Sequence, residues 1–428
     1  MALGTDIVKI SRMESVIFPE FPRKIFTENE IAYINTKNNK AQTSAGIFAA
    51  KEAVLKAFGK GITLPLNQVE ILHLEGGAPR IKLLGAVADF AGENGFEEVE
   101  ISISHDGEYA IACAYARINN YALCHQKALF KLKNCPRDTI TPELIAHRLP
   151  KRKSDSHKGT YGRLYIVAGS LGLTGAAIMA SKASLICGAG LISLACPKEL
   201  NTIFETALTE VMTKPIPSRE GLISLEGAED ILKNVSASDL CLIGPGLGRG
   251  DEITKIVQIV IENTSKPIVA DADGLNAISH NTEILKKCKA PVIITPHIGE
   301  FAALTGMDIP TILENPQMHA LAFARRYNTV VVLKSHNTVV ASPDGRVCVN
   351  RLGNPGMATG GSGDVLSGAV ASFAVQGIDP FEAALLGVYI HSLAADMASF
   401  EKGEYSLTPG DILEYIPYAI KYTQAKGD

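Results

Sequence analysis

Hydrophobic and polar positions follow two different patterns along this 428-residue chain. Up to about residue 117, short runs of alternating or apolar residues predict strands, and longer periodic stretches predict helices. The expected strands cover residues 3–10, 69–74, 79–84, 98–104 and 109–115, and the expected helices cover residues 45–58 and 86–93. Short strands mixed with helices indicate a small α+β domain over residues 1–117.

From about residue 141 continuous apolar runs alternate with helical patterns. The apolar runs lie at residues 164–168, 191–196, 240–243, 267–270, 292–295 and 330–333, and the helical patterns at 175–187, 251–262, 299–304 and 317–327. Strands that are apolar at every position are typical of a largely parallel sheet covered by helices on both faces. We therefore predict an α/β domain over residues 141–428, and we assign the patternless residues 118–140 to a linker.

Composition narrows the class of protein. A hydrophobic content of 46% and a net charge of -4 describe a globular protein with no reason to bind nucleic acid or an acidic membrane surface. The eight cysteines include no C-x-x-C pair, which favours a reducing compartment over a disulfide framework or zinc site. Asp6 and Lys9 interrupt the first residues, so we expect no signal peptide and a cytoplasmic protein without a membrane partner.

The densest candidate for chemistry is the glycine-rich stretch at residues 354–368. Its glycines before the acidic residue are Gly356, Gly360, Gly361 and Gly363. They precede Asp364 and an apolar run that predicts a helix, and glycine amides at a helix start favour a phosphate group. A carboxylate there is unfavourable unless it has a role, such as accepting the proton of a hydroxyl that is being phosphorylated. The alternative is a glycine-rich turn in which Asp364 caps the helix.

A second set of candidates lies in the first domain. Asp6 falls within an apolar strand, Glu52 and Lys56 share one helix face, and His105 ends another strand. Two carboxylates together favour Mg²⁺, and a neighbouring lysine favours a phosphate. The alternative is a surface ion pair, a capped strand and an ordinary surface histidine.

The first domain resembles holo-acyl-carrier-protein synthases, which are small Mg²⁺-dependent phosphopantetheinyl transferases. The resemblance rests on residues 4–8, 48–56, 59–61 and 101–105, in that order, and covers nearly all of residues 1–117. It implies that Asp6 and Glu52 bind Mg²⁺, that Lys56 contacts a coenzyme A phosphate, and that His105 lies beside the coenzyme. It also implies acyl carrier protein as partner and a homo-oligomer, typically a trimer, with sites shared between subunits.

Two positions depart from the usual pattern of these synthases. Thr5 stands where Ile or Val is usual, and Lys60 stands where Thr is common. Neither position is one of the two candidate magnesium ligands, so the implied metal site is unaffected.

The second domain resembles ADP- or ATP-dependent NAD(P)H-hydrate dehydratases of the ribokinase-like superfamily. Seven ordered motifs carry the resemblance, at residues 157–162, 169–176, 184–190, 244–248, 271–276, 295–300 and 354–364. It implies that the hydrated nicotinamide nucleotide contacts Ala176, Gly246, His297 and Asp364, with Asp364 as the catalytic base. It further implies that the adenine nucleotide contacts Lys334, Ser335, His336, Asn337, Thr338 and Gly363.

Three further points concern this second resemblance. Ser335 replaces a glycine that is usual in the family, which leaves the backbone approach to the nucleotide open. Asp273 and Asn276 are candidates to orient phosphates or a metal, against an ordinary turn rich in Asp and Asn. The Rossmann-type epimerase domain often fused to the bacterial dehydratase is not found in residues 1–117, so we expect epimerisation of the hydrate from another protein.

The combined hypothesis is a bifunctional enzyme that transfers 4′-phosphopantetheine from coenzyme A to acyl carrier protein and dehydrates NAD(P)H hydrate with ADP or ATP. A ribokinase-like kinase for a vitamin precursor or sugar is the alternative for the second domain, and a non-catalytic oligomerisation module is the alternative for the first. The motifs at residues 271–276 and 295–297 favour the dehydratase. A module without catalysis would have no need for Asp6 within a strand.

Overall fold

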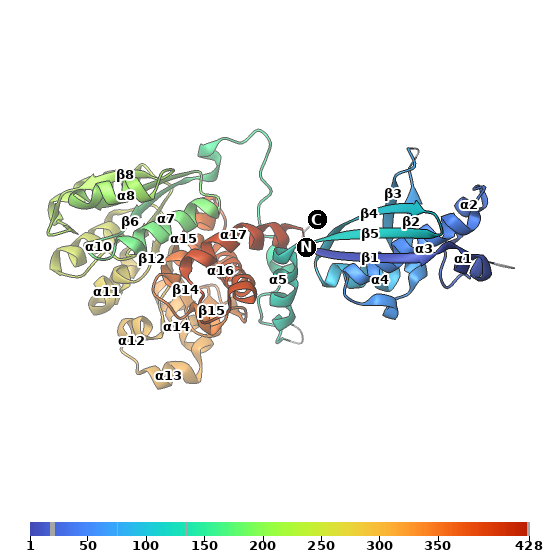
Figure 1. The fold of residues 1–428 in the computed structure, drawn as a ribbon. Helices are drawn as coiled ribbons and strands as arrows, with labels where there is room; N and C mark the ends of the chain where they lie inside the picture. The colour runs from blue at the N-terminus through green and yellow to red at the C-terminus, as the bar shows by residue number, and fades with distance from the viewer. Residues whose placement is uncertain (18–21, 75, 133–134, 426–428) are drawn as a thin grey trace. The chain divides into compact units, whose positions relative to one another are not determined.

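The computed structural model describes residues 1–17, 22–74, 76–132 and 135–425 and divides into two compact units, Met1–Gln126 and Lys127–Asp428 (Figure 1). The division falls within the segment 118–140 that the sequence suggested as a linker. Helix α5 (Asn120–Leu129) and a short 3₁₀ turn (Phe130–Leu132) occupy part of that segment, and its residues 133–134 lie outside the described residues.

A three-stranded antiparallel sheet forms the centre of the first unit, in the order β1 (Ala2–Lys9), β5 (Tyr109–Ile118), β4 (Phe96–Asp106). Every second residue of β5 from Ala110 to Ala116 is a fully buried alanine. These small side chains let the 18-residue helix α3 (Lys40–Ala57) pack closely against one face of the sheet. The remaining elements are α1 (Ile10–Ile17), α2 (Glu28–Asn35), β2 (Val69–His73), β3 (Pro79–Leu83) and α4 (Gly85–Glu93).

The second unit is built on a nine-stranded sheet in the order β16-β15-β14-β13-β12-β11-β6-β7-β8. The strands are β6 (Arg163–Val167), β7 (Leu191–Pro197), β8 (Met212–Ile216), β11 (Leu240–Ile243), β12 (Ile268–Ala270), β13 (Val292–Ile294), β14 (Thr329–Leu333), β15 (Thr338–Ala341) and β16 (Val347–Asn350). All pairs from β8 to β14 are parallel, and β15 and β16 add an antiparallel hairpin at one edge. The predicted fold class is therefore confirmed, as are the six predicted strands, β6, β7, β11, β12, β13 and β14.

Helices cover both faces of this sheet (Figure 1). On one face α15 (Ser362–Val375) lies against α7 (Thr174–Ile186) and α16 (Pro380–Lys402), and α16 also contacts α17 (Pro409–Gln424). The other helices are α6 (Pro142–Ala146), α8 (Asn201–Ala207), α9 (Ala228–Ser236), α10 (Asp251–Asn263), α11 (Asp273–Ile278), α12 (Ile298–Thr305), α13 (Ile309–Glu314) and α14 (Pro316–Tyr327). A small hairpin of β9 (Ser218–Arg219) and β10 (Leu222–Ile223) completes the unit.

Helix α16 is apolar on nearly all sides. In the described part of the chain it is the one helix long and apolar enough to cross a membrane, but 89% of its apolar window is buried inside the structure. It contacts α15, α17 and the strands from β13 to β16, which explains its composition as that of a core helix.

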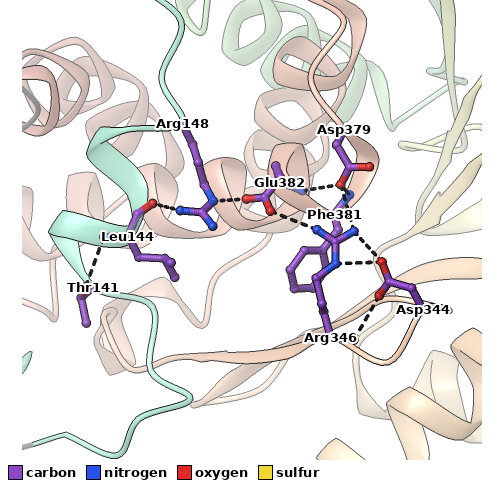
Figure 2. Close-up of polar contacts among 8 residues, drawn as sticks. All are labelled: Thr141, Leu144, Arg148, Asp344, Arg346, Asp379, Phe381 and Glu382. Atoms are coloured by element: carbon purple, nitrogen blue, oxygen red, sulfur yellow. Dashed lines mark hydrogen bonds and ion pairs between the residues drawn. The ribbon is translucent and has the colours of Figure 1, made fainter.

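Charged side chains anchor the start of α16 (Figure 2). Arg148 binds Glu382 on the first turn of the helix, and Arg346 in the β15–β16 turn binds the same carboxylate at 3.0 Å. Arg346 also pairs with Asp344 at 2.7 Å and with the helix-capping Asp379 at 3.4 Å. The segment before β6 and the edge hairpin are thereby both attached to α16.

Candidate active sites

The carboxyl ends of three neighbouring strands carry the polar residues of the second unit. Asp271 directly follows β12, and Lys334 directly follows β14. Strand β13 lies between β12 and β14. His297, three residues after the end of β13, forms a parallel bridge with Lys334. Ligands on parallel sheets bind at this edge, so the strand order itself assembles the candidate site.

Lys334 is surrounded by carboxylates. Its ammonium nitrogen lies 2.8 Å from an oxygen of Asp271, which is 1% exposed, and 4.0 Å from an oxygen of Glu300. Burial alone would lower the pKa of Lys334, but the carboxylates of Asp271 and Glu300 raise it above its usual value. The lysine is therefore positively charged and suited to hold a phosphate group.

Asp364 is the third residue of α15 and not its cap. The cap position is Gly361, which has a φ of 99° and supplies no side chain, so the interpretation of Asp364 as a helix cap is wrong. Burial raises the pKa of Asp364 to about 7, with further contributions from the negative charges of Asp271 and Asp273. The charge of Lys334 opposes this shift. A carboxyl group with a pKa near neutrality is well matched to proton transfer.

The predicted nucleotide residues lie partly together. A Cβ atom at Gly363 would be 3.4 Å from the Lys334 ammonium, so this lysine lies directly beside the start of α15. Ser335, His336 and Asn337 form the turn before Thr338 begins β15, and the Ser335 hydroxyl donates to the carbonyl of Asn337 at 2.8 Å. In the same turn the side chains of Asn337 and His336 are hydrogen-bonded to each other at 2.8 Å.

Two of the predicted hydrate-binding residues are neighbours. Gly246 has a φ of 56°, and a Cβ atom there would lie 2.8 Å from the Cβ of Ala176. The glycine-rich turn 244–248 also lies against the loop after β12, because the amide of Gly248 donates to Asp273 at 3.0 Å. Asn276 donates to the same carboxylate at 3.3 Å. Asp273 and Asn276 both lie in helix α11, where Asp273 holds the amide of Gly248, and the charge of Asp273 raises the pKa of Asp364.

His297 has a structural role in addition to its predicted one. Its Nδ1 accepts from the amides of Gly299 and Glu300 at 2.9 and 3.2 Å and so caps helix α12. The cap requires an unprotonated Nδ1, which leaves Nε2 as the donor of the neutral ring. The side chain is 60% exposed, and its Nε2 lies 3.6 Å from an oxygen of Glu300.

The sequence alone indicates no role for Asp271 or Glu300, although they lie within the motifs at residues 271–276 and 295–300. The available signal was an acidic residue immediately after an apolar strand, where burial requires a partner. The partner of Asp271 is 63 residues away in the chain and became identifiable only with the strand order.

The candidate metal site of the first unit contains Asp6, Glu52 and Lys56. Lys56 lies 2.7 Å from Oδ1 of Asp6 and 3.9 Å from Glu52. Oδ2 of Asp6 is buried and has no hydrogen-bond partner, and burial together with the Asp6 charge raises the pKa of Glu52. Across the described ranges no group of three or more His, Cys, Asp or Glu side chains could hold a metal ion. Two adjoining carboxylates nevertheless fit Mg²⁺, which usually takes one or two and completes its shell with water and phosphate oxygens.

His105 lies apart from these residues. Its Nε2 is 3.1 Å from the carbonyl oxygen of Gln42, near the start of α3. A Cβ atom at Gly46 would lie 2.8 Å from the same nitrogen, and Gly46 precedes Glu52 by six residues, which corresponds to about 9 Å along the helix. Within one chain the structure therefore brings Asp6, Glu52 and Lys56 together, but not His105.

Comparison with known proteins matches each unit to a family. A family model described as NAD(P)H-hydrate dehydratase matches residues 164–418, and one described as the 4′-phosphopantetheinyl transferase superfamily matches residues 2–114. The chain is similar to a bifunctional NAD(P)H-hydrate repair enzyme of Moorella thermoacetica, with 40% identity over 286 residues, 67% of this chain and 54% of the relative. It is also similar to an ADP-dependent (S)-NAD(P)H-hydrate dehydratase of Neisseria meningitidis, with 36% identity over 60% of this chain and 84% of the relative.

Among solved structures, the chain resembles the ADP/ATP-dependent NAD(P)H-hydrate dehydratase of Bacillus subtilis co-crystallized with ATP/Mg²⁺. The TM-score is 0.57 at 29% identity, covering 68% of this chain and 99% of that chain. The chain spans about half the length of the bifunctional relatives that it matches.

Proposed function

Because the chain belongs to the NAD(P)H-hydrate dehydratase family and carries a phosphopantetheinyl transferase unit ahead of that domain, we propose that it is a bifunctional enzyme. The C-terminal unit would convert (6S)-NAD(P)H hydrate back to NAD(P)H with ADP or ATP. The N-terminal unit would transfer 4′-phosphopantetheine from coenzyme A to a serine of acyl carrier protein. Such an enzyme would serve cofactor repair and fatty acid synthesis in the cytoplasm, without nucleic-acid or membrane partners.

The position of Asp364 is the observation that carries the dehydratase proposal. Its pKa of about 7 and its place beside Lys334 and Gly363 suit a base that takes the hydroxyl proton of the hydrate. Lys334 and the glycine amides of the loop would hold the terminal phosphates of the nucleotide. The hydroxyl would then take the terminal phosphoryl group of the nucleotide, and loss of phosphate together with a proton from the neighbouring ring carbon would restore the ring double bond of the reduced nicotinamide.

The substrate would lie between this base and the turn at residues 244–248. Ala176 and Gly246 would contact the hydrated nicotinamide nucleotide, since the left-handed backbone at Gly246 leaves no room for a side chain. His297 would offer its exposed Nε2–H to the same ligand. The turn Ser335–Thr338 would border the adenine nucleotide beside Lys334.

In the first unit Asp6 and Glu52 would hold Mg²⁺, and the buried, unpartnered oxygen of Asp6 supports this assignment. When bound, the metal would neutralise the charge on the pyrophosphate of coenzyme A. Lys56, now paired with Asp6, would turn to a coenzyme phosphate, and its 46% exposed side chain permits that movement. His105 would lie beside the coenzyme.

We also infer a homo-oligomer, a trimer or larger, from two observations on the first unit. His105 does not contact Asp6 or Glu52 within one chain, which fits a site shared between two copies. The sheet face opposite α3 exposes a set of apolar side chains, namely Leu3, Ile7, Tyr109, Ile111 and Tyr115. An apolar face of this kind is typical of a protein interface.

The decisive experiment incubates the protein with hydrated NADH and either ADP or ATP. Recovery of the near-ultraviolet absorbance of reduced nicotinamide, with matching release of phosphate from the reaction, is the expected result. Phosphorylation of a pyrimidine, thiazole or sugar alcohol without any such recovery would favour a kinase. A separate assay with coenzyme A, Mg²⁺ and apo acyl carrier protein tests the first unit, and its failure would favour a non-catalytic oligomerisation module.

A further inference from the structure

A buried carboxylate in the C-terminal half of α16 holds the beginning of the glycine-rich loop. Asp396 is 0% exposed and accepts from the amide of Gly353 and the side-chain amide of Asn354, both at 2.9 Å. Its third partner is Lys131, whose ammonium lies 2.6 Å from Oδ1 and also donates to the carbonyl of Gly353 at 2.8 Å. Lys131 therefore contacts both the carboxylate and the loop that the carboxylate holds.

The same helix holds the loop at two other points. Ser392 accepts from the side chain of Asn350 at 3.0 Å, just before the loop begins. The Nε2 of His391 lies 3.4 Å from the hydroxyl of Ser362, two residues before Asp364. Contacts with α16 therefore lie at both ends of the loop that carries Asp364.

Lys131 supplies the charge that Asp396 requires. A carboxylate without solvent exposure is strongly unfavourable unless a cation pairs with it, and removal of one partner leaves an uncompensated buried charge. Lys131 lies between the ranges matched by the two family models, 2–114 and 164–418. The countercharge for a core residue of the second unit therefore comes from the segment that connects the two units.

This connecting segment is bound to the second unit at further positions. Thr139 forms a parallel bridge with Val349 of β16, and the amide of Val349 donates to the carbonyl of Asp138 at 2.8 Å. Farther along, Arg148 binds Glu382 at the start of α16 (Figure 2). Asp138 and Thr139 are thus bound to the edge strand β16, and Arg148 is bound to the start of α16. These contacts hold the chain in place on the C-terminal side of Lys131.

We propose that Lys131 is a positioning residue for the dehydratase site: by pairing with Asp396 it fixes Gly353 and Asn354, and through them the loop that presents Asp364. The expected effect on kcat rests on the proposed function, whereas the expected effect on the order of the loop does not. It makes the connection to the transferase unit part of the dehydratase machinery, so that a change in this segment alters turnover.

The test compares three variants of the full-length chain: Lys131→Met, the conservative Lys131→Arg, and Lys127→Met as a matched control at an exposed lysine of the same segment. Hydrogen exchange of peptides covering residues 350–364 is the first readout. Lys131→Met should exchange there at least about tenfold faster, since the loop loses its anchor, while the other two variants match wild type. Unchanged exchange in Lys131→Met, or equal acceleration in Lys127→Met, would overturn the proposal.

The second readout is dehydratase kinetics. Lys131→Met should lower kcat by about ten- to a hundredfold through misplacement of the base, with little change in KM, and Lys131→Arg should restore most of it. Faster exchange with an unchanged kcat would overturn the positioning role.

If Lys131→Met fails to fold, the double variant Lys131→Met/Asp396→Asn removes the buried charge. This double variant should fold with the loop still loosened, and slow exchange of residues 350–364 in it would count against the proposal. If the wild type does not dehydrate the hydrate, the proposed function is refuted. The exchange data would still show whether the pairing of Lys131 with Asp396 holds the loop in place.

Discussion

The Lys334 ammonium lies 2.8 Å from a carboxylate oxygen of Asp271, although the two residues are 63 positions apart in the chain. This pair sets the charge balance of the site. One lysine balances the carboxylates of Asp271, Asp273 and Glu300 around Asp364, so these surroundings remain negative even with Lys334 charged. Burial is the main cause, and with this excess negative charge it raises the pKa of Asp364 to about 7.

This balance predicts the pH dependence of dehydration. The base must be ionised, so kcat/KM should rise with pH through about 7 and level off above it. Asp273→Asn should move this rise to lower pH, because the charge of Asp273 raises the pKa of Asp364, whereas Lys334→Met should move it to higher pH. Rate profiles between pH 5 and 9 check both directions. A rise near pH 4 in wild type would show that Asp364 is not the titrating base.

The transferase site makes a prediction about metal removal. Asp6→Asn should abolish transfer of phosphopantetheine to apo acyl carrier protein and leave the fold intact, because it removes a charged ligand whose second oxygen has no partner. A chelator should have the same effect on wild type. Glu108→Gln is the matched control, since Glu108 is exposed and pairs only at the surface with Lys9 at 3.2 Å. Transfer that survives both Asp6→Asn and chelation would exclude the metal assignment.

The exposed sheet face makes a prediction about assembly. Ile7 and Ile111 are directly paired across β1 and β5 and are 59% and 40% exposed. Ile111→Glu places a charge in the centre of this apolar face, so it should reduce the molar mass seen by light scattering to that of one chain and lower transferase activity. Tyr405→Glu, at an exposed aromatic residue of the second unit, should change neither. A wild type that is monomeric while active in transfer would contradict the shared site.

Most of the central elements could be predicted from periodicity. The alternation in β5, where each second residue is a buried alanine, and the continuous apolar runs of β11 and β14 are direct consequences of one-sided and two-sided burial. Strand β8 was missed because its sequence Met-Thr-Lys-Pro-Ile is that of a polar edge strand. Helix α16 was missed because burial on nearly all sides removes the polar face that periodicity detects.

The site was predictable in its motifs but not in its contacts. Asp364, Gly363 and Lys334 were all identified, yet nothing local indicates that Lys334 meets Asp271, since that contact depends on β13 lying between β12 and β14. The pairing of Lys131 with Asp396 spans 265 positions and joins a polar segment to an apolar helix. Long-range pairs of charges are set by tertiary packing, which a single sequence does not reveal.

The substitution Asp364→Asn tests the central assignment through both turnover and stability. Turnover of hydrated NADH should fall by about two to four orders of magnitude, the usual loss with a general base, while nucleotide binding persists through Lys334 and the loop amides. The folded-state pKa is raised, so the folded protein binds this proton more tightly than the unfolded chain, and ionised Asp364 destabilises the fold as pH increases toward and beyond 7. The Asn variant should therefore unfold at a higher temperature than wild type at pH 8, and the two should converge below about pH 4.

These two measurements separate the possible roles of Asp364. A base that acts on a hydroxyl is required by a kinase as well as by a dehydratase, so loss of turnover alone does not distinguish them; recovery of nicotinamide absorbance by wild type does. A stabilised but inactive Asn variant is the combination expected of a residue whose charge is retained for catalysis at a cost to the fold. If Asp364→Asn turns over at the wild-type rate, neither the dehydratase nor the kinase can use Asp364 as its base, and the proton must go to another group such as Asp271 or Asp273.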